Sequence, residues 1–349
     1  MNNNFKEENM NKEIDWDDVG FSYKPVEKRF VAFCKGGIWS QGKMTNNPNI
    51  VLNECAGVFQ YAQTCFEGLK AKRSKSGKLV TFRPEMNAKR MISTCKRLCI
   101  PPIPEELFLK AVDEVVKANA DFVPPYGTGA SLYLRPFIYG SSPVIGVFPS
   151  KEYTFRLFGT IVGSYFKGGL KPIKLMVSDY DRAAPCGTGN IKAGLNYAMS
   201  MYPGQLAHSL GYDENMYLDS KTRTFVEETG GANFLFVTKE GTIVTPQSDT
   251  ILPSITRNSL ITVARKLLNL EIEERPVAFE EVKDFAECAL CGTAAVISPV
   301  GMVHSKDKDI YFPNGMENPG PITQKLYDTL TSIQIQEIEA PEGWVRECK

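Results

Sequence analysis

The sequence has little histidine, no net charge and no long apolar run, and each of these features excludes a class of function. Among its 349 residues are two histidines, and 40 basic side chains balance 40 acidic ones. Nucleic acids and anionic membrane surfaces attract an excess of positive charge, so we expect neither as a partner. No apolar run is long enough to cross a bilayer. The polar first residues resemble neither a secretory signal nor an Arg-rich transit peptide, so we expect a cytoplasmic protein.

The cysteine pattern argues against a metal centre or a redox switch. The nine cysteines are an odd number spread along the chain, which favours reduced thiols. Cys288 and Cys291 form a single Cys-x-x-Cys motif, whereas a structural zinc site needs a second pair or suitably spaced histidines. The two histidines are His208 and His304. A redox pair is expected at a helix N-terminus, but residues 279–286 predict a helix before this motif. We therefore expect no metal.

The sequence also lacks the fingerprints of nucleotide-binding folds. No Gly-x-Gly-x-x-Gly follows a predicted strand, and there is no P-loop, internal repeat or low-complexity tract. The length favours two domains of ordinary size. We expect a poorly ordered tail at 1–15, a small domain at 16–166 and a large domain at 173–349. Residues 167–172, rich in glycine with a closing proline, are the expected linker.

Apolar spacing predicts alternating helices and strands in the N-terminal half. A helix is expected over 84–98, where a proline stands in the first turn. A second helix begins at Pro104, and its apolar residues recur at helical spacing. In residues 132–135, side chains that suit opposite faces of a strand alternate. Residues 153–158 alternate in the same way and continue into the apolar Ile161 and Val162, so a second strand is expected over 153–162.

The C-terminal half favours hairpins followed by helices. The expected hairpins span 216–226 and 234–244, each with a polar turn. Ser254 is placed to cap a helix with an apolar stripe, and the last helix is expected over 322–333. This order of elements predicts an α+β fold and not a doubly wound parallel sheet.

Residues 189–197, with the sequence GNIKAGLNY, are the most informative stretch. Lys192 is the only cation in it and lies near Ile191 and Leu195. Apolar surroundings disfavour the ammonium and lower the pKa of a lysine. A neutral lysine amine is a nucleophile that can form a Schiff base with a carbonyl. Most lysines are instead solvated at the surface, so this stretch alone leaves both interpretations open.

Six short blocks occur in the order found in one enzyme family. They are FEGLK at 66–70, YLRP at 133–136, GNIKAGLNY at 189–197, VEETGGANF at 226–234, LPSITR at 252–257 and CGTAA at 291–295. Together they resemble the fold-type IV pyridoxal-phosphate aminotransferases. The first two narrow the match to the branched-chain amino-acid aminotransferases. The resemblance runs from about Trp16 to the C-terminus, and it implies a small N-terminal α/β domain and a larger C-terminal domain of mixed β-structure and helices.

The resemblance implies pyridoxal 5'-phosphate as the cofactor and a role for each matched residue. Lys192 would be the Schiff-base lysine and the base that moves the substrate proton. Glu228 would face the pyridine nitrogen, and Tyr197 would contact the ring hydroxyl. The phosphate would be held by four residues, Arg90, Ile255, Thr256 and Thr293. A helix start behind Ser254 also suits an anion by itself, because its free N–H groups point outward.

Glu227 and Glu228 are neighbours on a predicted strand. Alternation turns their side chains to opposite faces, so at most one of them faces the cofactor ring. The residues alone do not choose between the two. The family match assigns Glu228 and leaves Glu227 as an expected surface glutamate.

Tyr133 and Arg135 are two positions apart on a predicted strand and therefore share a face. A guanidinium fork matches a carboxylate, and we expect Arg135 to bind the γ-carboxylate of glutamate. The strand could equally be one with a simple wet face. The resemblance adds four further residues of the substrate pocket, Tyr61, Phe66, Tyr165 and Ala294. An aromatic pocket of this kind suits leucine, isoleucine and valine side chains.

The loop with Ile145 and Val147 resembles one that reaches the active site of a neighbouring subunit, which implies a homodimer. Two departures from animal family members stand out. Gly231 replaces a threonine, so a hydroxyl is missing there. Ala295 and Ser298 replace their redox cysteines.

The implied reaction is a reversible ping-pong transfer of the amino group between L-leucine, L-isoleucine or L-valine and 2-oxoglutarate. Two other activities share the fold, those of D-amino-acid aminotransferase and aminodeoxychorismate lyase. Both families are shorter and usually lack the Tyr-x-Arg-Pro strand. A non-catalytic binding module is a further alternative, against which the joint presence of Lys192, Glu228, Tyr197 and Arg90 argues.

Overall fold

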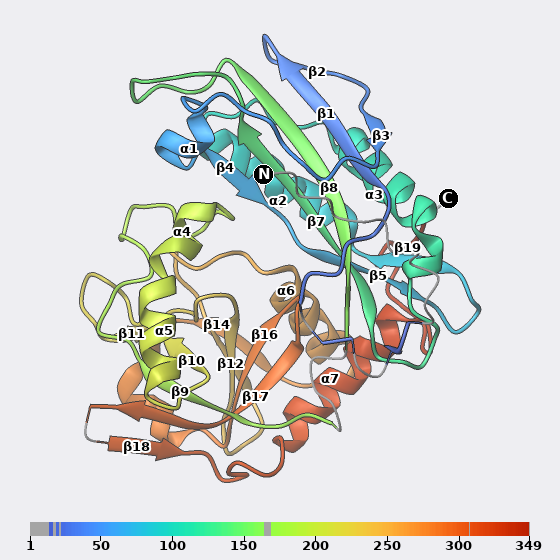
Figure 1. Ribbon diagram of the computed structural model, residues 1–349. Helices are drawn as coiled ribbons and strands as arrows, with labels where there is room; N and C mark the ends of the chain where they lie inside the picture. Colours follow the sequence, from blue (N-terminus) through green and yellow to red (C-terminus); the bar gives the residue numbers. More distant parts are fainter. Residues whose placement is uncertain (1–13, 17–18, 21, 164–168, 307, 349) are drawn as a thin grey trace.

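Figure 1 shows the computed structural model, which describes residues 14–16, 19–20, 22–163, 169–306 and 308–348. The expected tail lies mostly outside the described residues, as do Tyr165 and the first part of the expected linker. The described chain forms a nine-stranded sheet, an eight-stranded sheet and a two-stranded ribbon. In Figure 1 the first sheet lies above the second. The fold is α+β, as the order of elements predicts.

The first sheet is antiparallel throughout, with the order β19-β6-β5-β7-β8-β1-β2, to which β3 and β4 add beside β1 and β7. Its strands are β1 (Arg29–Lys35), β2 (Ile38–Trp39), β3 (Lys43–Thr45), β4 (Thr64–Phe66), β5 (Leu69–Arg73), β6 (Leu79–Phe82), β7 (Ser131–Gly140), β8 (Glu152–Val162) and β19 (Val345–Glu347). The short helix α1 (Gly57–Tyr61) leads into β4.

Helices α2 (Pro84–Arg97) and α3 (Glu105–Ala118) pack on this sheet. Their apolar stripes and the inward side chains of the central strands form one buried cluster, in which Phe108 and Phe155 are fully buried. Both helices begin within one residue of the predicted starts. The predicted strands at 132–135 and 153–162 are parts of β7 and β8.

The second sheet is mixed, with the order β10-β9-β17-β16-β12-β13-β14, and β18 pairs with β17. Its strands are β9 (Ile173–Val177), β10 (Glu214–Met216), β12 (Asn233–Val237), β13 (Ile243–Pro246), β14 (Ile272–Arg275), β16 (Glu287–Gly292), β17 (Val296–Ser305) and β18 (Lys308–Tyr311). The pairs β9–β10, β9–β17 and β13–β14 are parallel.

Both faces of the second sheet are buried. On one face Phe234 and Phe236 belong to an apolar cluster, and on the other Leu235 and Val237 pack with helices. These helices are α6 (Ile255–Thr262), continued by a π-helical turn (Val263–Leu267), and α7 (Pro321–Gln334). Helices α4 (Gly194–Met199) and α5 (Met201–Ser209) lie at one side in Figure 1.

Two elements refine the sequence-based expectations. The helix expected over residues 279–286 is a 3-10 helix that spans Phe279–Asp284. Phe279, Val282 and Phe285 reach the same core at three-residue spacing. The expected hairpin at 216–226 has its turn, where the Asp219 N–H donates to the Phe225 carbonyl. Beyond the turn, Leu218 pairs with Val226 in an antiparallel bridge, and Tyr217 exchanges backbone hydrogen bonds with Glu227 and Glu228, so the two arms form the expected hairpin. In addition, β10 pairs with β9, and β11 (Phe225–Val226) pairs with β15 (Val277–Ala278).

The C-terminal strand β19 returns to the first sheet and pairs with β6. The end of the chain is thus joined to the N-terminal half, although the sequence suggests a large domain that runs to residue 349. The domain boundaries stay a prediction. Among the described residues, no helix is both long enough and apolar enough to span a membrane.

Candidate active site

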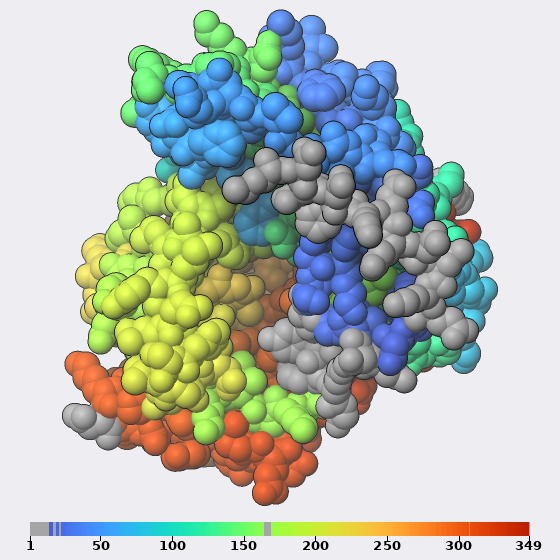
Figure 2. Space-filling model, in the orientation of Figure 1, coloured from blue at the N-terminus to red at the C-terminus, as the bar shows by residue number. Residues whose placement is uncertain are grey.

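A cavity of about 440 Å³ lies between elements of the two sheets. Figure 2 shows the surface hollowed where the blue N-terminal segments meet the yellow and orange C-terminal ones. Most of the predicted site residues line the cavity: Phe66, Arg90, Tyr133, Arg135, Lys192, Tyr197, Glu228, Ile255, Thr293 and Ala294. The fold therefore gathers blocks that are far apart in the sequence.

Lys192 lies just before helix α4 and faces the aromatic side of the cavity. Its Nζ donates a hydrogen bond of 2.8 Å to the Tyr197 hydroxyl and lies 4.9 Å from the centre of the Phe66 ring. Burial, and next the positive charge of Arg90, lower the pKa of Lys192 to about 7. Burial also raises the pKa of Tyr197 well above its ordinary value, so its phenol stays protonated. The sequence predicts that the surroundings of Lys192 lower its pKa, and the pKa is shifted in that direction.

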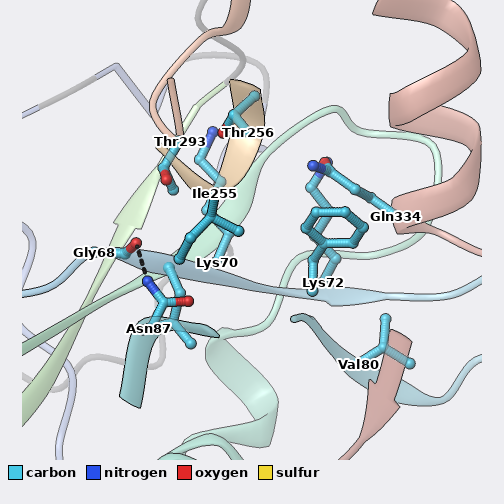
Figure 3. Close-up of a pocket in the computed structure, with 11 residues that line it drawn as sticks. Gly68, Lys70, Lys72, Val80, Asn87, Ile255, Thr256, Thr293 and Gln334 are labelled. Carbon is cyan, nitrogen blue, oxygen red and sulfur yellow. Dashed lines mark hydrogen bonds between the residues drawn. The ribbon is translucent and has the colours of Figure 1, made fainter. Parts of the chain in front are cut away.

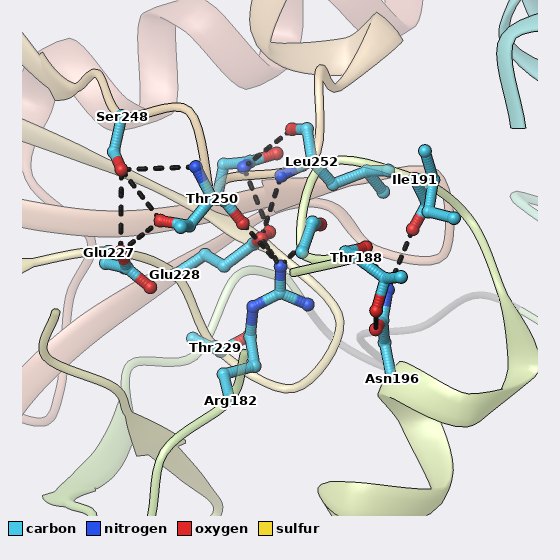
Figure 4. Close-up of polar contacts among 12 residues, drawn as sticks. Arg182, Thr188, Ile191, Asn196, Glu227, Glu228, Thr229, Ser248, Thr250 and Leu252 are labelled. Carbon is cyan, nitrogen blue, oxygen red and sulfur yellow. Dashed lines mark hydrogen bonds and ion pairs between the residues drawn. The ribbon is translucent and has the colours of Figure 1, made fainter. Parts of the chain in front are cut away.

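Local contacts explain why the stretch around Lys192 folds as it does. Gly189 packs so closely that a Cβ there would lie 2.2 Å from the Thr250 carbonyl oxygen. The Asn196 side-chain amide donates to the carbonyls of Thr188, at 2.7 Å, and Ile191, at 2.9 Å (Figure 4). These contacts hold the loop before α4 and so fix the backbone that carries Lys192.

Glu228 is buried at another wall of the cavity, with 3% of its surface exposed. Its carboxylate accepts hydrogen bonds from the Leu252 N–H at 2.8 Å and the Asn233 amide at 3.2 Å, and it pairs with Arg182 (Figure 4). Burial raises the pKa of Glu228 to about 7, although Arg182 opposes this shift.

The expectation that Glu227 is a surface glutamate is wrong. It is also 3% exposed, and its carboxylate accepts hydrogen bonds from the hydroxyls of Thr250 and Ser248 (Figure 4). Residues 226–229 are all buried, so this segment is covered on both sides and has no surface face. Of the two glutamates, only Glu228 lines the cavity, which agrees with the expectation that at most one of them faces it. Burial raises the pKa of Glu227 as well.

Sequence reasoning missed Arg182, which joins several parts of the site. It is 4% exposed, pairs with Glu228 and donates to the carbonyls of Gly189, at 2.7 Å, and Thr250, at 2.9 Å. No motif covers it. A single arginine within the short stretch Asp181-Arg182-Ala183-Ala184 was the only signal.

Glu67 was also missed as a site residue, although it lies in the FEGLK block. It is fully buried and binds Arg90 through two contacts of 2.7 Å. Burial lowers the pKa of the Arg90 guanidinium, but Glu67 outweighs this effect and holds the pKa above its ordinary value. Arg90 also donates to the Pro253 carbonyl at 3.0 Å, directly before helix α6.

The start of α6 is suited to an anion. Ser254 caps the helix as predicted, since its hydroxyl accepts the Arg257 N–H at 3.1 Å. The first N–H groups of a helix have no partner within it and carry partial positive charge. With the Arg90 guanidinium beside Pro253, this corner of the cavity fits a phosphate group. Thr256 lies behind it, in the wall of a smaller cavity that Ile255 and Thr293 also line.

Tyr133 and Arg135 share a face of β7, as predicted. Arg135 donates to the Tyr133 hydroxyl at 3.1 Å, and its guanidinium lies 4.8 Å from the centre of the Phe66 ring. Leu132 and Leu134 are fully buried on the other face. The Nε atom of Arg135 is buried and has no hydrogen-bond partner among the described residues. An unsatisfied cationic donor at this place fits the carboxylate of a substrate.

The structure does not bring every predicted residue to the cavity. Tyr61 is 37% exposed outside the cavity lining, and its hydroxyl donates to the Ile145 carbonyl. Ile145 and Val147 are 78% and 84% exposed. Tyr165 lies outside the described residues. The roles of all four residues stay predictions.

Cys288 and Cys291 lie on strand β16 and pack in different apolar clusters on its two faces. Residues three apart on a strand point to opposite sides. Burial raises the pKa of both thiols, that of Cys291 to about 12. Among the described residues, no group of three or more His, Cys, Asp or Glu side chains is arranged to hold a metal ion.

Comparisons with known proteins agree with this site. A family model described as amino-transferase class IV matches residues 64–303. The branched-chain-amino-acid aminotransferase of Haemophilus influenzae is 48% identical over 339 residues, which cover 96% of this chain and 98% of that protein. The enzyme of the same name from Helicobacter pylori is 47% identical over 336 residues, with 96% and 98% covered.

Solved structures show the same fold. The branched-chain amino acid aminotransferase of Escherichia coli matches with a TM-score of 0.77 at 26% identity, covering 92% of this chain and 99% of that one. The branched-chain amino acid aminotransferase of Thermobaculum terrenum, solved in its PLP-form, matches with a TM-score of 0.75 at 22% identity, with 94% and 100% covered. The chain therefore belongs to the class IV aminotransferases and, within them, to the pyridoxal-phosphate-dependent branched-chain-amino-acid aminotransferases.

Proposed function

We propose that the 440 Å³ cavity is the site at which this enzyme transfers an amino group between L-leucine, L-isoleucine or L-valine and 2-oxoglutarate. The observation that carries this proposal is the position of the Lys192 amine. It contacts Tyr197 in a cavity that has an anion-binding corner at Arg90 and α6, and a buried acid at Glu228. These features match the amine, phosphate and ring-nitrogen requirements of pyridoxal phosphate, which supplies the electron sink of transamination.

Lys192 would hold the cofactor covalently and then act as a base. Its lowered pKa leaves a large fraction of the amine neutral near pH 7, as a nucleophile and a proton acceptor both require. Once the amine is free, it would take the proton from the substrate Cα and pass it to C4′, the cofactor carbon that carries the transferred nitrogen. Tyr197, held beside it at 2.8 Å, would fix the position of the amine and donate to the ring hydroxyl.

Glu228 would keep a proton on the pyridine nitrogen. A carboxylate does this only while it is itself ionised, and burial alone works against that state. The Arg182 guanidinium and the N–H of Leu252 favour the ionised form. Arg182 therefore has a supporting role in the proposal: it preserves the charge on Glu228.

Phe66, Tyr133 and Arg135 would receive the substrate side chain. Phe66 and Tyr133 offer aromatic surface to a branched aliphatic chain. Arg135 would pair with the γ-carboxylate of glutamate, since a buried charge is costly without a partner. In the leucine half-reaction the Tyr133 hydroxyl still accepts one hydrogen bond from Arg135.

We further propose a homodimer in the cytoplasm. Ile145 and Val147 form an exposed apolar loop, which the Tyr61 hydroxyl ties to helix α1. A second copy of the chain would cover this loop. The loop of one subunit would then lie near the cavity of the other subunit. All nine cysteines are free thiols, as expected in a reducing compartment. Light scattering on the purified protein tests the dimer, and a monomer that is fully active would exclude it.

A substrate panel tests the proposed activity. We expect the protein with pyridoxal phosphate and 2-oxoglutarate to consume L-leucine, L-isoleucine and L-valine much faster than D-alanine or D-glutamate. Faster turnover of the D-amino acids, or release of pyruvate from aminodeoxychorismate, would show one of the other activities of this fold. A colourless protein that binds no cofactor would exclude all three.

A further inference from the structure

A second, smaller cavity adjoins the wall of the proposed active site (Figure 3). Its volume of about 30 Å³ holds a water molecule or two but no organic ligand. Gly68, Ile255 and Thr293 line both cavities, so they form a common wall. On the opposite side the small cavity is lined by two lysines of β5, Lys70 and Lys72.

The two lysines lie two positions apart on β5 and so share a face. The Lys70 amine donates to the carbonyl of Ala294, and the Lys72 amine donates to the side-chain oxygen of Gln334 at 3.3 Å. Both partners are neutral. The described residues that line the small cavity include no aspartate or glutamate. The positive charge of these amines is therefore not neutralised by a carboxylate in this cavity.

The environment of both amines disfavours their charged form. Burial, and next the charge of Lys72, lower the pKa of Lys70 to about 7. Burial lowers the pKa of Lys72 to about 8. An anion that binds at the common wall would favour the charged form of the nearer amine.

Lys70 is the nearer of the two to the turn at 293–295, which joins β16 to β17. In Figure 3 its side chain extends from β5 toward Thr256 and Thr293, whereas Lys72 extends toward Gln334 on α7. The proposed function places the cofactor phosphate at Thr293 and the substrate at Ala294. The hydrogen bond from Lys70 to the Ala294 carbonyl thus joins strand β5 of the first sheet to the turn at 293–295. In the proposed function this turn contacts the cofactor phosphate and the substrate carboxylate.

We propose that Lys70 is a positioning residue of the active site. Its ammonium braces the Thr293–Ala294 turn against strand β5 and provides positive charge behind the wall where the cofactor phosphate and the substrate carboxylate bind. This inference rests on the proposed function and adds to it a residue that touches neither reactant. A hydrogen bond from a charged donor is stronger than a neutral one, which suits a brace.

This role predicts a specific pattern of effects. Because Lys70 acts on binding through the turn, its loss should weaken the binding of cofactor and substrate. The proton transfer at Lys192 should change much less, so KM should rise more than kcat falls. Lys72 lines the same cavity but bonds to Gln334, so it provides a matched control.

The test compares Lys70→Met, Lys70→Arg and Lys72→Met with the wild type. One measurement is the dissociation constant of pyridoxal phosphate, obtained by titrating the cofactor-free proteins. The other is KM and kcat for L-leucine and L-glutamate at saturating cofactor. For Lys70→Met we expect the dissociation constant and both KM values to rise about tenfold, the usual scale for losing a charged hydrogen bond. Lys70→Arg keeps the charge and the donor and should stay within about threefold of the wild type, as should Lys72→Met.

Three results would overturn the inference. They are unchanged cofactor affinity and KM in Lys70→Met, an equal effect of Lys72→Met, or a loss confined to kcat. If Lys70→Met does not fold, Lys70→Gln, which is neutral and polar, should show the same rise in both constants. A wild-type protein that neither binds the cofactor nor transaminates would instead overturn the proposed function and the role of Lys70 together.

Discussion

Lys192, Tyr197 and Glu228 are ionisable side chains in a largely water-excluded part of the molecule, and their pKa values differ from those in water. Burial brings the pKa values of Lys192 and Glu228 from opposite directions to about 7 and raises that of Tyr197 well above its ordinary value. Near neutral pH the amine and the carboxyl group can therefore each change protonation state, whereas the phenol cannot. Arg90 and Arg182 then decide which states prevail.

The two neighbouring glutamates should respond differently to loss of charge. Glu228→Gln should lower kcat with little change in KM, because the amide cannot hold the proton on the ring nitrogen. Glu227→Gln should instead lower the free energy of unfolding by about 1–3 kcal/mol, since its buried hydrogen bonds to Thr250 and Ser248 are disturbed. Steady-state kinetics and urea unfolding separate the two effects. The reverse pattern would show that Glu227 is the acid at the cofactor.

Arg135→Met should separate the two half-reactions. Glutamate should lose about 2–5 kcal/mol of transition-state stabilisation, because its γ-carboxylate would be buried without a partner. Leucine should lose much less. Single-turnover measurements with each amino acid give the two rates directly. Equal losses would mean that Arg135 holds the α-carboxylate shared by both substrates.

At the scale of elements, loops far apart in the sequence are joined by single buried side chains. Arg182 connects the loop before α4 with the segments at 228 and 250. Asn196 closes the same loop on itself. Neither contact follows from hydrophobic spacing, which concerns only neighbours along one element.

Arg182→Met should therefore affect both stability and catalysis. Removing one partner of a buried ion pair costs about 3–5 kcal/mol of unfolding free energy. The pKa of Glu228 should rise further, so the rising limb of the kcat profile should move to higher pH. Arg223→Met is the matched control, because its pair with Asp181 is much more exposed, with 35% and 48% of the two side chains accessible, and contributes about 1 kcal/mol or less. Similar losses in the two variants would contradict the role given to Arg182.

Local signals predicted the elements better than their pairing. The start of α2 at Pro84 and the cap of α6 at Ser254 depend on residues next to each other, so the sequence shows them. The return of β19 to β6 joins the end of the chain to residues about 260 positions away, and no local pattern encodes that. The same limit applies to Arg182 and Glu67, whose importance comes from partners across the fold. Glu227 was misplaced because the sequence of the segment at 226–229 gives no sign that all four residues are buried.

At the scale of the whole molecule, folding shifts the pKa values of two active-site groups, so the free energy of unfolding depends on pH. The pKa of Lys192 falls from 10.5 to about 7 on folding. Between these values the unfolded chain binds a proton that the folded chain does not, so this group makes stability rise with pH. For Glu228, whose pKa rises from 4.5 to about 7, stability falls as the pH rises through that lower window.

Unfolding of the cofactor-free protein should show the first of these slopes. We expect the free energy of unfolding to rise between pH 7 and 9, and Lys192 can contribute up to about 1.4 kcal/mol per pH unit. Lys192→Met removes the titrating amine and should reduce the slope. Urea unfolding at several pH values measures it. An unchanged slope in Lys192→Met would show that the amine is solvated in the folded protein.

Chemical labelling of the lysine that binds the cofactor tests the central claim most directly. Borohydride reduces the bond between pyridoxal phosphate and the lysine amine, and mass spectrometry of the digested protein then locates the label. The account predicts one labelled residue, Lys192, within the peptide GNIKAGLNY. A label on another lysine, including Lys70, whose pKa is also about 7, or no label at all, would contradict it.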